Sequence, residues 1–491
     1  MEEVPPDPGA LIESMRAFGY RLPTAIADLI DNSITARATN VWVDFHWAGR
    51  DSWIVVRDDG IGMDSQTLTN AMRLGSRSPV ERRDSHDLGR FGLGLKTAAF
   101  SQGRALTVAS HEAGGDVEVR RWDLDFVTQR GTWALLHEPD PRSANALIAL
   151  PATDSGTIVL LHRLDRIAAA DTDDEAARDR FFEEVAGVEE HVSMVFHRFL
   201  DRRGFHLHVN GNEIDPWDPF LIAHPATQRL APEELTLENL TIHIQPWVLP
   251  YFSTMTPDDH RRARGPQGWN AHQGFFVYRG KRLLVPGDYL GLPFTQEEHF
   301  KLARIQVDLD NALDLLWHID VRKATAQIPL ALRADMRRIA QRTRRAAADS
   351  YRFRGKAIAR RAPTAGDFVW RRQELRDGAI RYVVNREHPL VRAAFTEVGA
   401  DHAVVERVLR LVEESIPITA IAMDASEHPE HSHLRIPFHG HTEEVFTLLE
   451  RLHRELVDNG AAEDSALEVL ARIEPFDSHP EIVAAYAEGL H

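Results

Sequence analysis

The sequence contains no cysteine, so it can form neither a disulfide nor a thiolate metal site, which suits a reducing compartment. It also has no apolar run that approaches the roughly 20 residues of a membrane-spanning helix. Residues 1–6, MEEVPP, have neither the basic nor the apolar region of a signal peptide. We therefore expect a cytoplasmic protein without membrane contact.

Basic residues are scarce relative to acidic ones: 57 Lys and Arg against 74 Asp and Glu give a formal net charge of −17. Such a surface repels polyphosphate, which disfavours coating of nucleic acid but still allows a local basic track. The hydrophobic share of 43% and the charged share of 27% are typical of a folded chain. A chain of 491 residues exceeds one ordinary core. We predict three domains, at residues 1–170, 171–361 and 362–491.

The first domain is predicted to be an α/β sandwich with an antiparallel sheet, of the α+β class. Residues 24–36 predict an amphipathic helix, in which Asp28 and Asn32 lie one turn apart on the same side. Runs rich in β-branched and aromatic residues predict strands at 41–45, 53–59, 105–110, 115–123 and 157–162.

Three short segments of this domain carry side chains that suit a nucleotide: DLIDN (28–32), DDGIG (58–62) and GRFGLGLK (89–96). Hydrolysis of ATP needs a positioned water, neutralised phosphate charge and a gripped base. Asp28 can act as the general base, and the amide oxygen of Asn32 suits Mg²⁺, which prefers oxygen ligands. Asp58 can accept a hydrogen bond from the exocyclic amine of adenine. Together the segments predict a site for ATP and Mg²⁺.

Glycines in these segments are expected to bring the backbone close to the ligand. Gly60 and Gly62 would approach the base, and amides freed by glycine at a helix start would face the phosphates. Lys96 would add a mobile positive charge, and Thr157, at the start of a strand, would support Asp58. The remaining predicted nucleotide-binding residues are Met63, Gly89, Arg90, Phe91, Gly92, Leu93, Gly94 and Leu95.

Each segment alone has an ordinary interpretation. Asp28 and Asn32 would more often be solvated helix residues, an Asp-Asp-Gly sequence is usually a turn, and an isolated glycine motif is weak evidence for phosphate. Their order and separation make the combination specific.

These segments resemble the three nucleotide-binding motifs of the GHKL superfamily, which includes gyrase B subunits, heat-shock chaperones of that fold, histidine kinases and MutL. AIADLIDNSITA together with GRFGLGLKTAA is most similar to the MORC ATPases and their prokaryotic relatives. The match covers residues 20–160 and continues more weakly to about 350. The resemblance implies a Bergerat ATP-binding sandwich, with Asp28 in the general-base position, Asn32 at magnesium, Asp58 at adenine and residues 89–96 at the phosphates.

One position departs from this pattern, because most members with strong hydrolysis carry glutamate where this chain has Asp28. Aspartate is one methylene shorter, and a small misplacement of a catalytic group can cost a large factor in rate. We predict slow turnover with ATP binding intact. The resemblance further implies that residues 63–88 form a lid over the nucleotide, although a polar surface loop would have the same composition.

The second domain is predicted to contain a helix at 178–203, a hairpin at 205–220 with its turn at Asn210-Gly211, and strands within 240–249, 273–285 and 303–310. This order resembles the transducer domain of gyrase and MutL. In that family a lysine reaches the terminal phosphate. Lys323 is the candidate here and is assigned as a catalytic residue, with Arg322 as its rival. An ordinary exposed basic pair fits the sequence equally well.

Residues 330–361 predict a helix with one apolar face and many arginines. A solvated helix face and a phosphate track for DNA are both compatible with this pattern. The arginines proposed for DNA are Arg337, Arg338, Arg342 and Arg345.

The last region is predicted to be mainly helical, after a linker at 362–367. It shows a strand pattern at 380–385, a further strand at 416–424, and helices near 388–415, 441–459 and 463–473. Five histidines between 428 and 441 invite a metal interpretation, but their spacing fits no strong ligand pattern, so a solvated loop is favoured. We expect an interaction or dimerisation module.

The resemblance implies an ATP-gated dimeric clamp that acts in a DNA-related process, with its prokaryotic relatives placing it in restriction or anti-phage defence, where a partner effector protein would cooperate. Two alternatives remain open at this point. One is a chaperone of the same superfamily that acts on proteins, and the other is an ATP sensor without turnover.

Overall fold

The structure is a computed structural model that describes the chain except for residues 1–5, 18–19, 76–93, 142–153, 201–203, 252–253, 315, 320–324, 353–368, 375–379, 399–401, 418–441, 459–461, 472, 474–475, 477–479 and 490–491. The chain divides into two compact units, Met1–Gly355 and Lys356–His491, and each is described by itself.

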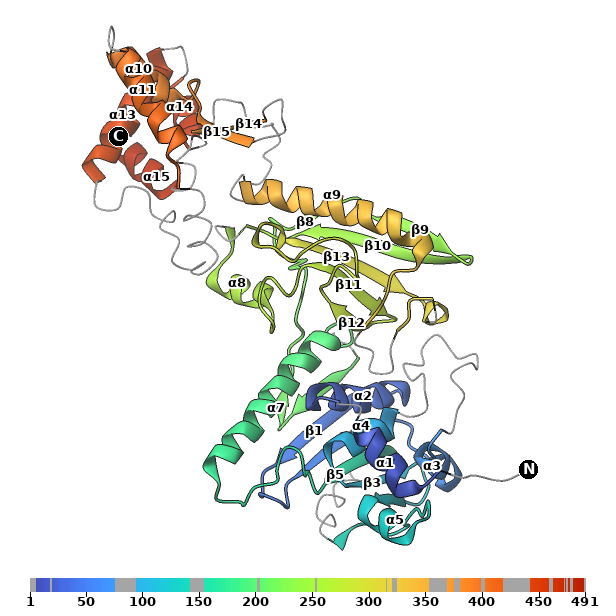
Figure 1. Cartoon of the computed structure of the whole chain (residues 1–491). Coiled ribbons are helices and arrows are strands. Elements are labelled where there is room, and N and C mark those ends of the chain that lie inside the picture. Colours follow the sequence, from blue (N-terminus) through green and yellow to red (C-terminus); the bar gives the residue numbers. More distant parts are fainter. Residues whose placement is uncertain are drawn as a thin grey trace. The chain divides into compact units, whose positions relative to one another are not determined.

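The first unit begins with a seven-stranded sheet in the order β4-β3-β5-β2-β1-β6-β7 (Figure 1). All neighbouring strands are antiparallel except β1 and β6, which run parallel. The strands are β1 (Asn40–His46), β2 (Trp53–Asp58), β3 (Ala105–His111), β4 (Glu118–Asp123), β5 (Gly156–His162), β6 (His206–Val209) and β7 (Asn212–Glu213).

Helices cover one face of this sheet, where inward-facing side chains such as Val41, Val43 and Val56 meet helix residues such as Leu29 and Phe100 in one core. Helix α2 packs against both α4 and α7 (Figure 1). The predicted α/β sandwich is confirmed. Its helices are α1 (Pro8–Arg16), α2 (Leu22–Thr35), α3 (Ser65–Met72), α4 (Gly94–Gln102), α5 (Leu124–Arg130) and α7 (Glu175–Val195).

The long helix α7 comes between strands β5 and β6 in the chain. Its N-cap Asp174 accepts a hydrogen bond from the Ala177 amide, and its apolar stripe is buried against α2. The next hairpin, β6–β7, extends the first sheet beside β1. Asn210 and Gly211 both have positive φ angles, of 47° and 81°, which confirms the tight turn predicted from this dipeptide.

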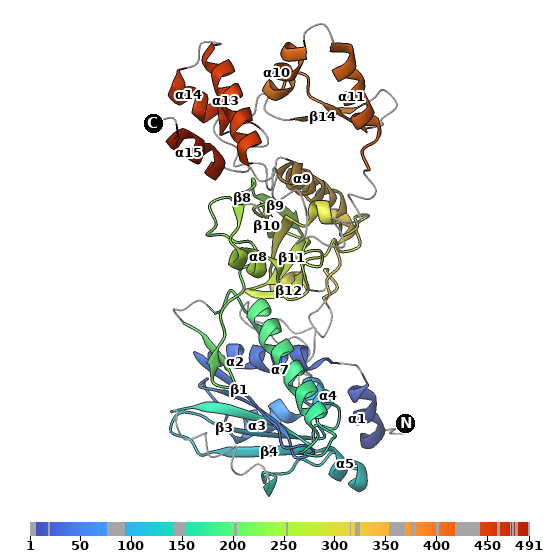
Figure 2. The same cartoon turned by 90° about the vertical axis from the view of Figure 1, so that its left-hand side faces the viewer.

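A second, six-stranded sheet has the order β12-β11-β13-β10-β8, with β9 paired to β10. Helix α9 (Arg333–Arg352) lies across this sheet against β10 and β13 (Figures 1 and 2). The apolar face predicted for α9 is buried there. The other elements are β8 (Gln228–Arg229), β9 (Glu233–Leu237), β10 (Leu240–Val248), α8 (Pro257–Arg264), β11 (Gly274–Arg279), β12 (Arg282–Pro286), η4 (Glu298–Phe300), β13 (Ala303–Leu309), η5 (Asn311–Leu313) and η6 (Leu330–Leu332).

The opposite face of the second sheet shares a core with the first sheet. Phe276, Tyr278 and Leu283 belong to the same cluster of buried side chains as Phe196, which comes directly after α7. Strand β12 packs against α7. The two sheets of the first unit are therefore joined through one continuous apolar interior.

The second unit contains a two-stranded hairpin and several helices, and its last three helices enclose a small core that includes Val445, Leu449 and Phe476. The helix predicted near 388–415 is two helices, α10 and α11, and no residue of α11 is buried. The strand predicted at 416–424 and the histidine cluster lie outside the described residues, apart from residues 416–417. The elements are β14 (Trp370–Glu374), β15 (Ile380–Val384), α10 (Pro389–Val398), α11 (His402–Glu414), α13 (Thr442–Asp458), α14 (Glu463–Leu470) and α15 (Pro480–Glu488).

Candidate nucleotide site

Asp58 stands at the end of β2 and its carboxylate is held by neutral donors. The Ser33 hydroxyl donates to Oδ2 at 2.8 Å, and the Gly60 amide donates to Oδ1 at 3.0 Å. Thr157 lies directly opposite Asp58 in the β2–β5 register, and its backbone supplies a further hydrogen bond. The predicted support from Thr157 is therefore a backbone contact, since its hydroxyl lies 2.8 Å from that of Ser110.

Burial raises the pKa of Asp58 to about 6, against the opposing effect of the hydrogen bonds from Ser33 and Gly60. The carboxylate is thus mostly ionised at neutral pH and protonates in mild acid. An ionised, buried carboxylate is a strong hydrogen-bond acceptor for an amine.

The turn after Asp58 requires glycine because the surrounding backbone comes very close. A Cβ on Gly62, where φ is 71°, would lie 1.8 Å from the His111 carbonyl oxygen. A Cβ on Gly60 would lie 2.8 Å from the Ala36 carbonyl oxygen. The Ser155 hydroxyl donates to the Gly60 carbonyl at 2.7 Å. These contacts within the protein account for glycine at both positions. The approach of the two glycines to the base stays a prediction.

Helix α2 places the two phosphate-end residues differently. The side chain of Asp28 is buried, with 3% of the residue exposed, whereas Asn32 one turn later is exposed. Between them, the Asp31 carboxylate is also buried. Asp31 Oδ1 lies 2.9 Å from Nε of Arg282, and Asp28 Oδ1 lies 3.6 Å from Nη2 of the same arginine. The buried carboxylates of Asp28 and Asp31 thus stand next to a buried cation, whereas the amide of Asn32 is exposed.

At the start of α4, the described residues leave room for a side chain at Gly94. Among the described residues, no atom would lie within 4 Å of a Cβ placed on Gly94. A helix N-terminus presents backbone amides to an anion. Together with the oxygen of Asn32, which suits Mg²⁺, these groups fit a metal-bound phosphate chain.

The prediction that Lys96 supplies a mobile positive charge at this end is wrong. The residue is buried, its Nζ donates to the Ala71 carbonyl at 2.9 Å, and burial lowers the pKa of its ammonium to about 8. The reason is that Lys96, in the first turn of α4, faces the end of α3 rather than solvent.

Some predicted residues fall outside the described part of the chain. Residues 89–93, which supply most of the glycine-rich segment, and Arg322 and Lys323 lie outside the described residues. Met63 and Leu95 are partly buried and pack against the core.

Comparison with known proteins bears directly on this site. Residues 20–157 match the family described as "Histidine kinase-, DNA gyrase B-, and HSP90-like ATPase". This stretch is similar to GHKL-type ATPase domains. The chain is also 34% identical over 91 residues to "ATPase morc-1" of Caenorhabditis elegans, an alignment that covers 18% of this chain and 10% of that relative. The chain thus spans about a tenth of the length of the relative it matches, and the similarity is to the MORC ATPases, as predicted.

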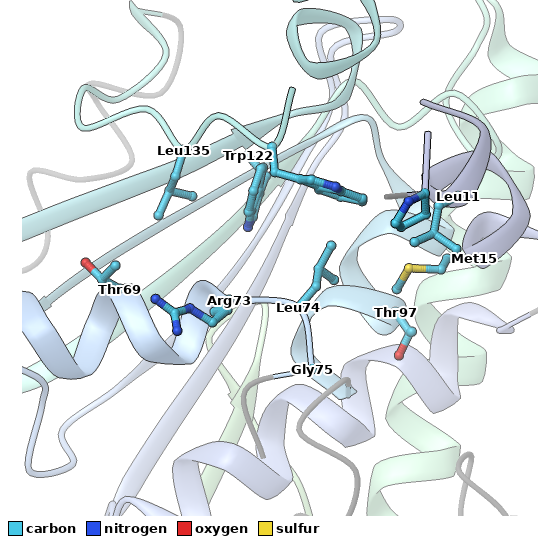
Figure 3. Close-up of a pocket in the computed structure, with 11 residues that line it drawn as sticks. Leu11, Met15, Thr69, Arg73, Leu74, Gly75, Thr97, Trp122 and Leu135 are labelled. Carbon is cyan, nitrogen blue, oxygen red and sulfur yellow. The ribbon is translucent and has the colours of Figure 1, made fainter. Parts of the chain in front are cut away.

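A cavity of about 660 Å³ is bordered by α1, by the segment after α3 and by α4 (Figure 3). Leu11 and Met15 of α1, Leu74 after α3 and Trp122 of β4 line it, and Thr97 of α4 borders it. Figure 3 shows mainly carbon-rich side chains facing this space, with Arg73 and Thr69 at one side. Its chemistry suits an apolar group and not a triphosphate, so we do not assign the nucleotide to it.

The sequence patterns did not single out three polar residues of the candidate site. Ser33 and Asp31 lie inside the predicted helix motif, so their positions in the helix could have drawn attention to them. Arg282 is separated from its partner Asp31 by 251 residues, and no local pattern signals the contact.

The arginines of α9 divide into two groups. Arg338 and Arg342 both contact the Glu233 carboxylate, at 2.6 Å and 2.8 Å. Arg337 and Arg345 are both exposed and make no such contact with Glu233. The structure thus assigns the first pair to an intramolecular ion cluster.

Two further features bear on ligands and location. None of the described helices combines the length and apolarity that crossing a bilayer requires. Within the described ranges, no group of three His, Asp or Glu side chains is arranged to hold a metal ion.

Proposed function

We propose that this chain binds ATP with Mg²⁺ and hydrolyses it slowly. The observation that supports this most strongly is the arrangement around α2, with the buried carboxylate of Asp28 and the exposed amide of Asn32 on successive turns. The adenine-matching acid Asp58 is hydrogen-bonded to Ser33 of the same helix. One helix thus connects the base-recognition end with the reaction end.

Each residue has a distinct role in this proposal. Asp58 accepts a hydrogen bond from the exocyclic amine of adenine, which guanine lacks at that position. The amides at the start of α4, from Gly94 onward, face the phosphate oxygens. The amide oxygen of Asn32 would hold Mg²⁺, which neutralises phosphate charge when bound.

Hydrolysis then needs one proton transfer by the protein. A water oxygen attacks the terminal phosphorus while Asp28 accepts the water's proton, and the bond to the bridging oxygen breaks to release ADP and phosphate. The short side chain of Asp28 holds its oxygens one methylene further from the water than glutamate would, which accounts for slow turnover.

We also propose that ATP closes two copies of the chain into a clamp acting on DNA in restriction or anti-phage defence, together with a partner effector protein. The similarity to a MORC ATPase supports this setting, and Arg337 and Arg345 are the two arginines of the predicted track that remain for phosphate contacts. Arg338 and Arg342 also belong to the predicted track, but both form ion pairs with Glu233, so they should contribute less to phosphate contacts than Arg337 and Arg345.

The basic experiment is calorimetry of the whole chain with Mg²⁺ and either ATP or GTP, combined with an assay of phosphate release. We expect ATP to bind, GTP to bind much more weakly and phosphate to appear slowly. Binding of ATP without any phosphate release would instead identify a sensor, and absence of ATP binding would overturn the proposal.

The DNA proposal has its own test. DNA affinity is measured at several salt concentrations, with and without a non-hydrolysable ATP analogue. Changing Arg337 and Arg345 to Glu should lower this affinity. The matched control changes Arg262 and Arg264 of α8 to Glu, which alters the net charge equally. Equal losses for both variants would rule out a specific track on α9.

A further inference from the structure

Arg282 belongs to the second sheet, outside the region that matches the ATPase family, yet its side chain is buried against helix α2. Only 2% of this residue is exposed. Its Nε donates to Asp31 Oδ1 at 2.9 Å, and its Nη2 lies 3.6 Å from Asp28 Oδ1. One guanidinium from β12 therefore contacts two carboxylates of the ATPase domain.

The two carboxylates lie three residues apart on α2, which places them on neighbouring turns of one helix face. Asp28 and Asp31 are 3% and 1% exposed, so water screens their mutual repulsion poorly. A cation between them offsets this repulsion. Arginine suits this position better than lysine because its planar fork offers several donors in fixed directions.

The guanidinium is also held from a third side. Its central carbon lies 5.8 Å from the ring of Phe196, which comes directly after α7. The position of Arg282 is thus set by β12, by α2 and by the end of α7, which are three elements of the shared core.

We propose that Arg282 is a positioning residue for the proposed general base, and this inference rests on the proposed ATP hydrolysis. Arg282, anchored on Asp31, fixes the orientation of the Asp28 carboxylate. Because Asp28 is shorter than glutamate, its oxygens reach the water only in a narrow range of orientations. The second sheet therefore sets the rate of the chemical step through Arg282 without touching ATP.

The same hairpin provides a matched control. Arg279 of β11 is the cross-strand partner of Arg282, is similarly buried, and forms an ion pair with Asp314 at 2.9 Å. Asp314 comes directly after η5 and is not part of α2. Replacing Arg279 thus removes a buried ion pair of the same kind from the same hairpin, but leaves Asp28 and Asp31 in place.

The experiment compares Arg282→Met, Arg282→Lys and Arg279→Met with the parent chain. For each variant we would measure ATP affinity by calorimetry, kcat by phosphate release and the melting temperature. We expect Arg282→Met to lower kcat roughly 10- to 100-fold while ATP affinity changes by less than about threefold. Arg282→Lys keeps a buried positive charge and should recover part of the rate, and Arg279→Met should keep the parental kcat.

A second measurement tests whether Arg282 acts through Asp28. In the Asp28→Asn background, adding Arg282→Met should produce no further loss of kcat, because the group that it orients is already absent. An independent further loss would overturn the positioning role.

Other outcomes would also overturn this inference. One is a kcat for Arg282→Met that equals that of Arg279→Met, and another is a loss of ATP affinity with unchanged kcat. If Arg282→Met does not fold, the lysine variant decides, since an unchanged kcat with lysine contradicts a need for the forked side chain. Absence of phosphate release in the parent chain would instead reject the proposed hydrolysis, and with it this role.

Discussion

The two ends of the candidate nucleotide site hold their buried carboxylates with different partners. At the adenine end, Asp58 is bonded to a hydroxyl and to backbone amides, all of them neutral. At the phosphate end, Asp28 and Asp31 share a guanidinium. Neutral donors offset only part of the cost of burying the negative charge of Asp58, so burial raises the pKa of this carboxyl to about 6. A cation instead stabilises negative charge and fixes its position. In the proposed mechanism the partner matches the task, which is recognition of an amine at one end and orientation of a base at the other.

Asp28→Asn should have the largest effect on activity. The amide cannot take a proton from water, so we expect kcat to fall roughly 100-fold or more while ATP affinity stays within a few-fold. Phosphate release and calorimetry measure these two quantities. Asp179→Asn, at an exposed position of α7, is the control for loss of one negative charge. Turnover that survives in Asp28→Asn would exclude Asp28 as the base.

Asp58→Asn should affect binding rather than the chemical step. The ionised acceptor is lost, and a hydrogen bond to a charged group is worth about 1.5–3 kcal/mol, so we expect ATP affinity to fall roughly 10- to 100-fold. The preference for ATP over GTP should shrink by a similar factor. Calorimetry with both nucleotides gives the result, and an unchanged preference would contradict recognition of adenine by Asp58.

The raised pKa of Asp58 predicts a pH dependence. The carboxylate accepts the amine hydrogen only when ionised, so ATP affinity should fall as the pH drops from roughly neutral through about 6. Burial favours the protonated acid, so Asp58 should favour the fold increasingly as the pH falls from about 6 towards its unfolded value of 3.8. Asp58→Asn should remove both effects, which separates them from protonation of ATP itself.

Ser33→Ala sharpens the same measurement. The hydroxyl lowers the pKa of Asp58, so its removal should move the midpoint of the affinity curve to higher pH. The matched control is Thr35→Ala, since the Thr35 hydroxyl donates to the Asp31 carbonyl and not to Asp58. An unchanged midpoint would show that the Ser33 hydroxyl does not set the charge of Asp58.

Arg338→Ala should have the smallest effect. The Arg338 side chain is 52% exposed, and exposed ion pairs contribute only about 0.2–1 kcal/mol to the free energy of unfolding. Thermal melting should detect a small loss, and ATP affinity and kcat should stay at the parental values. A large loss would show that ion pairs on α9 matter as much as those buried at α2.

The first sandwich was predictable because its elements have strong local patterns. The apolar spacing around Leu29 and Ile30 predicted α2, and the β-branched and aromatic residues of 41–45 predicted β1. The tight turn at Asn210-Gly211 results from two residues that tolerate positive φ. In the last region, the helix predicted near 388–415 is two helices, of which the first ends at Val398 and the second begins at His402.

The candidate site was predictable only where motif residues lie close in sequence. The sequence patterns predicted roles for Asp58 and Gly62, but the steric reason for glycine at position 62 is the His111 carbonyl of another strand, which no local pattern contains. Lys96 was placed correctly in a helix start, yet its burial depends on the packing of α4 against α3. The contact of Arg282 with α2 depends on the packing of two sheets, so only the three-dimensional structure reveals it.

The pairing of β6 with β1, and the packing of α7 on α2, have a practical consequence for recombinant fragments. A polypeptide ending near residue 170 would leave β1 as an open sheet edge and uncover the apolar surface that α7 covers, a combination that promotes aggregation. A polypeptide that ends at residue 213 would keep β6 paired with β1. Phe196 would still lose the side chains of the second sheet that share its core. The shortest well-behaved fragment should therefore extend to about Gly355, and nucleotide chemistry measured on anything shorter would report on a damaged protein.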